Sequence, residues 1–153
     1  MTDLVVARLT RPTPKQRAEL ALLFDCYRRH YGEQAAPDRT LEWLAAKIQT
    51  GLMTAFTAHR DAELIGLATV VVMPASLRLG HFWVLRDLFV RTDARRCGAA
   101  AALLRLVCEA AASDGALRVS LQTESDNVAA LRLYRSSGFE PVGGLDQLTY
   151  PLA

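Results

Sequence analysis

The sequence predicts an α/β or α+β fold built around one mixed sheet, and three observations support this class. Segments rich in β-forming residues alternate with segments in which apolar residues recur every three or four positions. The chain has 153 residues, a length that suits one globular domain, so we expect a single domain over residues 1–153. No linker, repeat or low-complexity segment interrupts the alternation.

The first half of the chain predicts strands and helices in a clear order. An apolar run at residues 4–9 suggests a strand, and residues 13–16 form a capping box with proline at the first helical position. A helix should therefore begin there and end near Gly32, and a shorter helix should end near Gly51. Stretches of β-forming residues then predict three strands, at residues 53–59, 64–73 and 81–90.

The second half of the chain continues the alternation. The alanine- and leucine-rich run from Gly98 to Ser113 predicts a helix that ends at Gly115. Alternating apolar residues at 117–121 predict a strand, and Asp126 can cap a helix that ends at Gly138. Two closing strands are expected at residues 139–142 and 148–152. The totals are about seven strands and four helices.

Composition and charge exclude several classes of protein. The chain carries no apolar stretch of about 20 residues, and its first residues lack the features of a secretory signal, so we expect a cytoplasmic protein with no membrane partner. A net charge of +2 gives no reason to expect a nucleic-acid partner. The three cysteines form no CxxC pair and the three histidines have no ligand spacing, so we expect neither a disulfide nor a metal.

One segment has the features of an anion site. The predicted strand at 81–90 leads into residues 95–100, where Arg95 and Arg96 precede Gly98 at the start of a helix. A helix N-terminus offers about four unpaired N–H groups and a partial positive charge, and Gly98 lets a phosphate approach them. The alternative is an alanine-rich core helix after a basic loop. The segment is neither the GxxxxGK[ST] loop nor the GxGxxG loop, and the chain contains neither of these motifs.

At these residues the sequence resembles the GNAT superfamily of N-acetyltransferases. Arg95-x-x-Gly98-x-Ala100 matches the Q/R-x-x-G-x-G/A pattern of that family's pyrophosphate loop. The apolar triplet at 88–90 stands where the family pairs a strand with the pantetheine arm, and residues 121–139 are similar to the family's second half. The resemblance implies the GNAT fold, a single twisted, mostly antiparallel mixed sheet, and acetyl-CoA as the acetyl donor.

The resemblance also implies which residues contact the cofactor. In the family, an Asn and a Tyr on the penultimate helix face it, and Asn127, Ala130 and Tyr134 have the spacing of one helical stripe. A helix cap for Asn127 and a packed core aromatic for Tyr134 are the alternatives. The predicted cofactor-binding residues are Leu88, Phe89, Val90, Arg95, Arg96, Cys97, Gly98, Ala99, Ala100, Asn127, Ala130 and Tyr134.

The same resemblance implies direct attack of an amine on the thioester in a ternary complex. Tyr134 is then the catalytic acid that protonates the departing thiolate. The amine must lose a proton, and Asp87, on the strand that adjoins the thioester in the family, is the candidate catalytic base. A structural aspartate is the alternative for Asp87, and Glu124 is a second candidate base. Arg86 departs from the acidic residue typical of polyamine acetyltransferases, which puts a polyamine substrate in doubt.

The sequence thus predicts an N-acetyltransferase that acts on a primary amine of a small molecule. The alternatives are a non-catalytic acyl-CoA-binding or sensor module, a protein-amine acetyltransferase, and an enzyme for another thioester such as succinyl-CoA. Dimers are common in the family, so a homodimer is possible. No residue pattern selects the acceptor amine.

Overall fold

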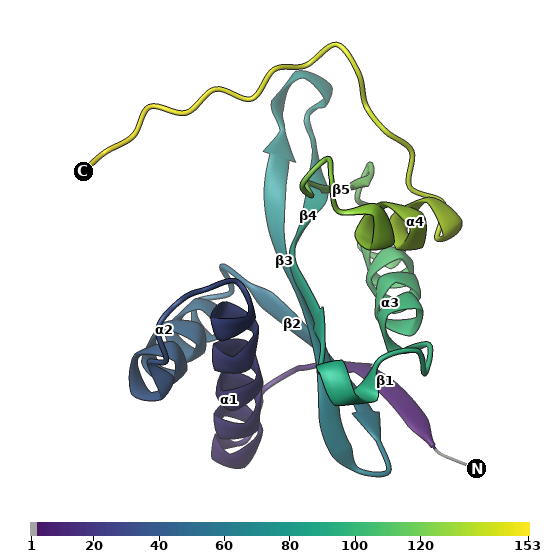
Figure 1. Cartoon of the computed structure of the whole chain (residues 1–153). Helices are drawn as coiled ribbons and strands as arrows, with labels where there is room; N and C mark the ends of the chain where they lie inside the picture. The colour runs from purple at the N-terminus through teal and green to yellow at the C-terminus, as the bar shows by residue number, and fades with distance from the viewer. Residues whose placement is uncertain (1–2) are drawn as a thin grey trace. The chain divides into compact units, whose positions relative to one another are not determined.

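A computed structural model describes residues 3–153, and the chain forms two compact units, Met1–Gln122 and Thr123–Ala153. In the first unit, five strands form one sheet in the order β1-β2-β3-β4-β5. Strands β1 to β4 are antiparallel neighbours, whereas β5 runs parallel to β4 (Figure 1). The mixed, mostly antiparallel sheet is therefore confirmed. The strands are β1 (Leu4–Arg8), β2 (Thr54–Arg60), β3 (Glu63–Ala75), β4 (Gly80–Val90) and β5 (Val119–Leu121).

Three helices cover the two faces of this sheet. Helices α1 (Pro14–His30) and α2 (Pro37–Gln49) lie on one face and α3 (Ala99–Ser113) lies on the other (Figure 1). The predicted capping box is confirmed, since Thr13 Oγ1 accepts from the Gln16 N–H at 3.1 Å and Gln16 Oε1 accepts from the Thr13 N–H at 2.8 Å. Short 3₁₀ turns occupy η1 (Ser76–Arg78), between β3 and β4, and η2 (Thr92–Ala94), between β4 and α3.

Each face of the sheet carries a buried apolar layer. On the α3 face, Leu103 and Val107 are fully buried, and the rings of Phe56 and Trp83 pack with their centroids 6.3 Å apart. Burying a leucine side chain contributes about 1.5–3 kcal/mol to folding, so these layers hold the helices on the sheet. The layer under α1 and α2 consists of Leu20, Leu23, Phe24, Leu44, Ala55, Leu67 and Phe89.

A β-bulge in β4 changes which side chains face each layer. Thr69 of β3 pairs with Asp87, but the next residue of β3, Val70, pairs with Leu85, so Arg86 is the extra residue. Side chains alternate strictly along a regular strand, and the inserted residue reverses the alternation. Trp83 therefore packs on the α3 face, whereas Phe89 packs against α1, with its ring centroid 5.5 Å from that of Tyr27.

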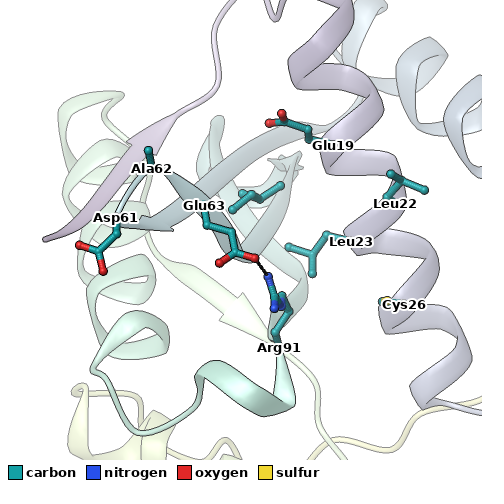
Figure 2. Close-up of a pocket in the computed structure, with 9 residues that line it drawn as sticks. Glu19, Leu22, Leu23, Cys26, Asp61, Ala62, Glu63 and Arg91 are labelled. Carbon is teal, nitrogen blue, oxygen red and sulfur yellow. Dashed lines mark hydrogen bonds and ion pairs between the residues drawn. The ribbon is translucent and has the colours of Figure 1, made fainter. Parts of the chain in front are cut away.

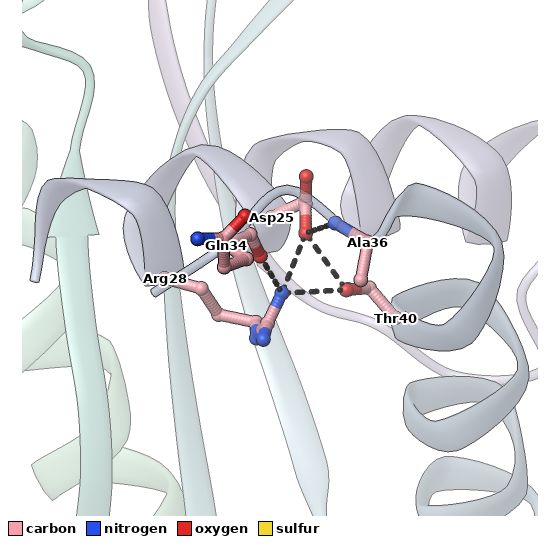
Figure 3. Close-up of polar contacts among 5 residues, drawn as sticks. All are labelled: Asp25, Arg28, Gln34, Ala36 and Thr40. Atoms are coloured by element: carbon pink, nitrogen blue, oxygen red, sulfur yellow. Dashed lines mark hydrogen bonds and ion pairs between the residues drawn. The ribbon is translucent and has the colours of Figure 1, made fainter. Parts of the chain in front are cut away.

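A polar network joins α1 to the start of α2 (Figure 3). Asp25 is buried, and its Oδ1 accepts from Arg28 Nη1 at 2.8 Å, from Thr40 Oγ1 at 3.0 Å and from the Ala36 N–H at 3.1 Å. Burial by itself would raise the pKa of Asp25, but these hydrogen bonds outweigh it and hold the pKa below its ordinary value. The buried carboxylate therefore fixes the connection between the two helices.

The second unit consists of α4 (Val128–Ser136) and a C-terminal segment without strands. The two closing strands expected at 139–142 and 148–152 are therefore wrong, and the sheet has five strands rather than about seven. Pro141 and Pro151 carry no N–H for a ladder, and Gly143-Gly144 interrupts the segment. A strand also needs a partner for its backbone groups, and an alternating pattern does not supply one.

Within residues 3–153, no helix combines the length and apolar character needed to cross a membrane. The expectation of one domain over residues 1–153 stays a prediction.

Candidate active site

The loop from β4 to α3 has the local geometry expected of an anion site. Gly98 is the N-cap of α3, adopts a left-handed conformation with φ 83°, and is not accompanied by a side-chain cap. A β-carbon built on Gly98 would meet no atom within 4 Å, so its side of the helix end is open. The first N–H groups of α3 have no carbonyl one turn earlier in the helix to bond, and they carry the positive end of its dipole.

The side chains around Gly98 divide between the exterior and the core. Arg95 folds back on β4, since its Nε donates to the Val90 carbonyl at 3.2 Å. Arg96 is exposed and left-handed, with φ 64°, and the Cys97 thiol donates to the Ala94 carbonyl at 3.1 Å. Ala99, predicted as part of the cradle, is buried, so its side chain belongs to the core.

Strand β4 has one open edge next to this loop. Its pairing with β5 covers only Trp83 to Leu85, whereas its pairing with β3 continues to Val90. Within the described residues of the first unit, residues 86–90 of β4 therefore have no strand on the β5 side. Backbone groups on an unpaired edge can bond an extended ligand in the way that a further strand would. Phe89 and Val90 are buried and Leu88 is half-buried, so the predicted triplet offers its backbone more than its side chains.

Asp87 lies on the α1 face, because the bulge at Arg86 turns it there. The Tyr27 hydroxyl donates to its Oδ1 at 2.9 Å, and the buried Thr69 hydroxyl donates to its Oδ2. The sequence pattern does not connect Tyr27 or Thr69 with Asp87. No local pattern signals these contacts, since the partners lie 60 and 18 positions away, and Tyr27 has the spacing of an ordinary core aromatic.

The second unit contains the other predicted site residues. Asn127 is the N-cap of α4, and its side chain accepts from the Ala130 N–H at 3.2 Å, so the capping role is present. The ring of Tyr134 packs edge-on against Phe139, with centroids 5.9 Å apart. Tyr134 and Ala130 are partly buried, whereas the second candidate base, Glu124, is exposed. The geometry of α4 therefore supports a packing role for Tyr134, and it places Asn127, Ala130 and Tyr134 at the helical spacing that the sequence predicts.

A separate cleft of about 560 Å³ lies between α1 and the β2–β3 turn (Figure 2). Glu63 pairs there with Arg91, which also pairs with Asp93, and hydrogen bonds to Asp93 and then to Glu63 raise the pKa of Arg91. None of the predicted site residues lines this cleft. Its lining residues are Glu19, Leu22, Leu23, Cys26, Asp61, Ala62, Glu63, Leu64 and Arg91.

The potential metal ligands and the thiol groups do not gather at one place in the part of the chain that is described. Among residues 3–153, no group of three or more His, Cys, Asp and Glu side chains could hold a metal ion. Cys26, Cys97 and Cys108 are free thiols, and burial raises the pKa of Cys108, which disfavours its reactive thiolate form.

Comparison with known proteins decides the family. A model of the Acetyltransferase (GNAT) family matches residues 18–139, well over half of the chain. The chain belongs to the GNAT family. It is 31% identical over 123 residues to the protein YhfO of Bacillus subtilis (strain 168), described as an uncharacterized N-acetyltransferase, and the match covers 80% of this chain and 83% of that protein.

Solved structures of other acetyltransferases share this fold. The crystal structure of a probable acetyltransferase is similar with a TM-score of 0.87 and 29% identity, over 99% of this chain and 98% of that one. An aminoglycoside N-acetyltransferase in complex with CoA is similar with a TM-score of 0.80 and 16% identity, over 99% of this chain and 97% of that one. The protein is thus an N-acetyltransferase of a family that uses acetyl-CoA.

Proposed function

We propose that this GNAT protein transfers the acetyl group of acetyl-CoA to a primary amine of a small molecule, by direct attack in a ternary complex. The observation that carries the proposal is the open, left-handed Gly98 at the N-terminus of α3, in the loop that follows a strand with an unpaired edge. The CoA-bound aminoglycoside acetyltransferase of similar fold supports a small-molecule acceptor. Its identity to this chain is too low to select an aminoglycoside.

The residues of the first unit fit the cofactor part by part. Gly98, Ala99 and Ala100 present backbone N–H groups for the diphosphate, and Arg96 adds an exposed positive charge. Arg95 holds the loop against the end of β4 through its bond to Val90. The backbone of residues 88–90 would pair with the pantetheine arm along the open edge. Bound acetyl-CoA supplies an acetyl thioester.

We assign the two proton transfers to Asp87 and Tyr134. An alkylammonium group has a pKa of about 10.4, so the acceptor must lose a proton before its nitrogen can attack. The Asp87 carboxylate would accept that proton, directly or through one water. The Tyr134 hydroxyl would donate a proton to the sulfur as the carbon–sulfur bond breaks. Asn127 and Ala130 share the Tyr134 face of α4 and would contact the cofactor.

Release of CoA in the presence of a panel of amines tests this function. The panel contains aminoglycosides, amino acids, polyamines and a lysine peptide, and free thiol is measured with a chromogenic disulfide. We expect amine-dependent thiol release with at least one small amine. Binding of CoA by calorimetry without thiol release from any amine would contradict the proposal and indicate a non-catalytic acyl-CoA-binding module. Replacing acetyl-CoA with succinyl-CoA in the same assay determines which thioester is preferred.

A further inference from the structure

The Asp87 carboxylate is oriented from two sides by hydroxyl groups of different elements. Tyr27 of α1 donates to one oxygen at 2.9 Å, and Thr69 of β3 donates to the other. A carboxylate has about four acceptor positions, so these two bonds leave room on each oxygen for one further donor. The carboxylate is therefore held in one orientation and retains capacity to accept a proton from an amine or a water.

The Tyr27 ring is fixed independently of its hydroxyl. Its centroid lies 5.4 Å from that of Phe24, 5.3 Å from that of Tyr31 and 5.5 Å from that of Phe89. Edge-on and tilted aromatic contacts of this kind hold a ring in place without its polar group. Phenylalanine at position 27 should therefore keep the packing between α1 and β4 and remove the hydroxyl that donates to Asp87.

Thr69 and Tyr27 do not have equal roles in this arrangement. Thr69 is the direct cross-strand partner of Asp87, so its bond spans only adjacent strands. Tyr27 comes from α1 and is the contact through which that helix orients the carboxylate. Without the Tyr27 bond, the Asp87 side chain is held at one oxygen only and can turn about its side-chain torsions.

We propose that Tyr27 is a positioning residue for catalysis, and that its hydroxyl aims the Asp87 carboxylate at the acceptor amine. This inference rests on the proposed function, in which Asp87 is the base. Misplacing a catalytic group by about 1 Å can cost as much as a hundredfold in rate, and loss of one of two orienting bonds should cost about tenfold. The effect should appear in kcat, because Tyr27 acts through the base and not through the cofactor site.

A double-mutant cycle on kcat tests the inference, with Tyr27→Phe, Asp87→Asn and the double variant assayed on the best amine of the panel. Asparagine keeps a side-chain oxygen that can accept from Tyr27 but cannot act as a base. A purely structural effect of Tyr27→Phe would therefore persist in the Asp87→Asn background, whereas a positioning effect would vanish there. Tyr31→Phe, at the C-cap of the same helix and with an exposed side chain, is the matched control.

We expect Tyr27→Phe to lower kcat about tenfold in the parent, with an unchanged KM for acetyl-CoA, and less than twofold in the Asp87→Asn background. Thr69→Val also removes a donor to Asp87, so it should likewise lower kcat in the parent and have a smaller effect in the Asp87→Asn background. It provides a second variant if Tyr27→Phe folds poorly. Equal losses in both backgrounds would overturn the inference while leaving Asp87 as the base. An Asp87→Asn variant with parental kcat, or no acetyl transfer by the parent, would overturn the proposed function and the inference together.

Discussion

The indole Nε1 of Trp83 donates a hydrogen bond to Asp114 Oδ2 at 3.0 Å, and this bond joins β4 to the residue that ends α3. The same oxygen contacts His81 Nε2 at 2.9 Å. The hydrogen bond from Trp83, followed by that from His81, lowers the pKa of Asp114 below its ordinary value of 3.8. The ionised carboxylate is thus favoured in the folded protein.

This contact predicts a specific loss of stability in acid. A group whose pKa is lowered by folding stabilises the protein above its unfolded pKa and loses that contribution as pH falls through the folded value. The free energy of unfolding of the parent should therefore decrease below about pH 3.8. The free energy of unfolding of the Asp114→Asn variant should decrease less steeply over the same pH range. Urea unfolding at pH 7 and pH 3 measures the difference, with Asp146→Asn in the exposed C-terminal segment as control. Identical acid dependence in the Asp114→Asn variant and the parent would contradict the assignment.

Substitution of Gly98 tests the diphosphate cradle. Gly98→Val places a β-carbon on the open side of the helix end and should weaken CoA binding at least tenfold, about 1.4 kcal/mol. Valine is strained at φ 83°, whereas asparagine tolerates the left-handed region. Because both residues add a β-carbon, Gly98→Asn distinguishes a loss of affinity caused by the blocked phosphate approach from one caused by backbone strain. Calorimetric titration of CoA, beside a melting curve, measures both variants. Parental affinity in a folded Gly98→Val protein would remove this loop from the binding site.

Removal of the Tyr134 hydroxyl tests the catalytic acid. Tyr134→Phe retains the ring that packs against Phe139, so the melting temperature should change little. Turnover should fall about a hundredfold or more, within the range for loss of a general acid, while acetyl-CoA affinity stays within a few-fold. Steady-state kinetics with the best amine of the panel provides the measurement. Turnover within threefold of the parent would leave water as the proton donor.

The buried Asp25 network should contribute to stability rather than to catalysis. Asp25→Ala leaves the Ala36 N–H, the Thr40 hydroxyl and Arg28 without their shared acceptor, which should cost about 2 kcal/mol. Glu33→Ala, at an exposed position near the end of α1, is the control and should change stability by less than about 0.5 kcal/mol. Denaturant unfolding compares the two. An equal effect of both substitutions would show that the network adds nothing.

Several features followed from the sequence because their causes are local. The capping box at Thr13 and Gln16 satisfies N–H groups within one turn, so it does not depend on the rest of the fold. The start of α3 at Gly98 follows in the same way from a glycine at the beginning of an alanine-rich run, whereas the left-handed conformation of Gly98 comes from the structure. The order of strands and helices through residue 136 could likewise be predicted, because the spacing of apolar residues and the glycines and prolines that end helices and strands act over a few residues.

Other features were decided only by the tertiary structure. Regular alternation places Trp83 and Asp87 on one face, and only the pairing of β4 with β3 introduces the bulge that separates them. The hydroxyl groups that orient Asp87 come from positions 60 and 18 residues away, a distance over which local pattern carries no information. The strands expected after Gly138 failed for the related reason that a strand exists only through its partner, and the sequence by itself does not name that partner. The sequence therefore determined the family and most of the helix ends, although Asn127 and not the expected Asp126 caps α4, while long-range pairing decided the faces, the hydrogen bonds of Asp87 and the number of strands.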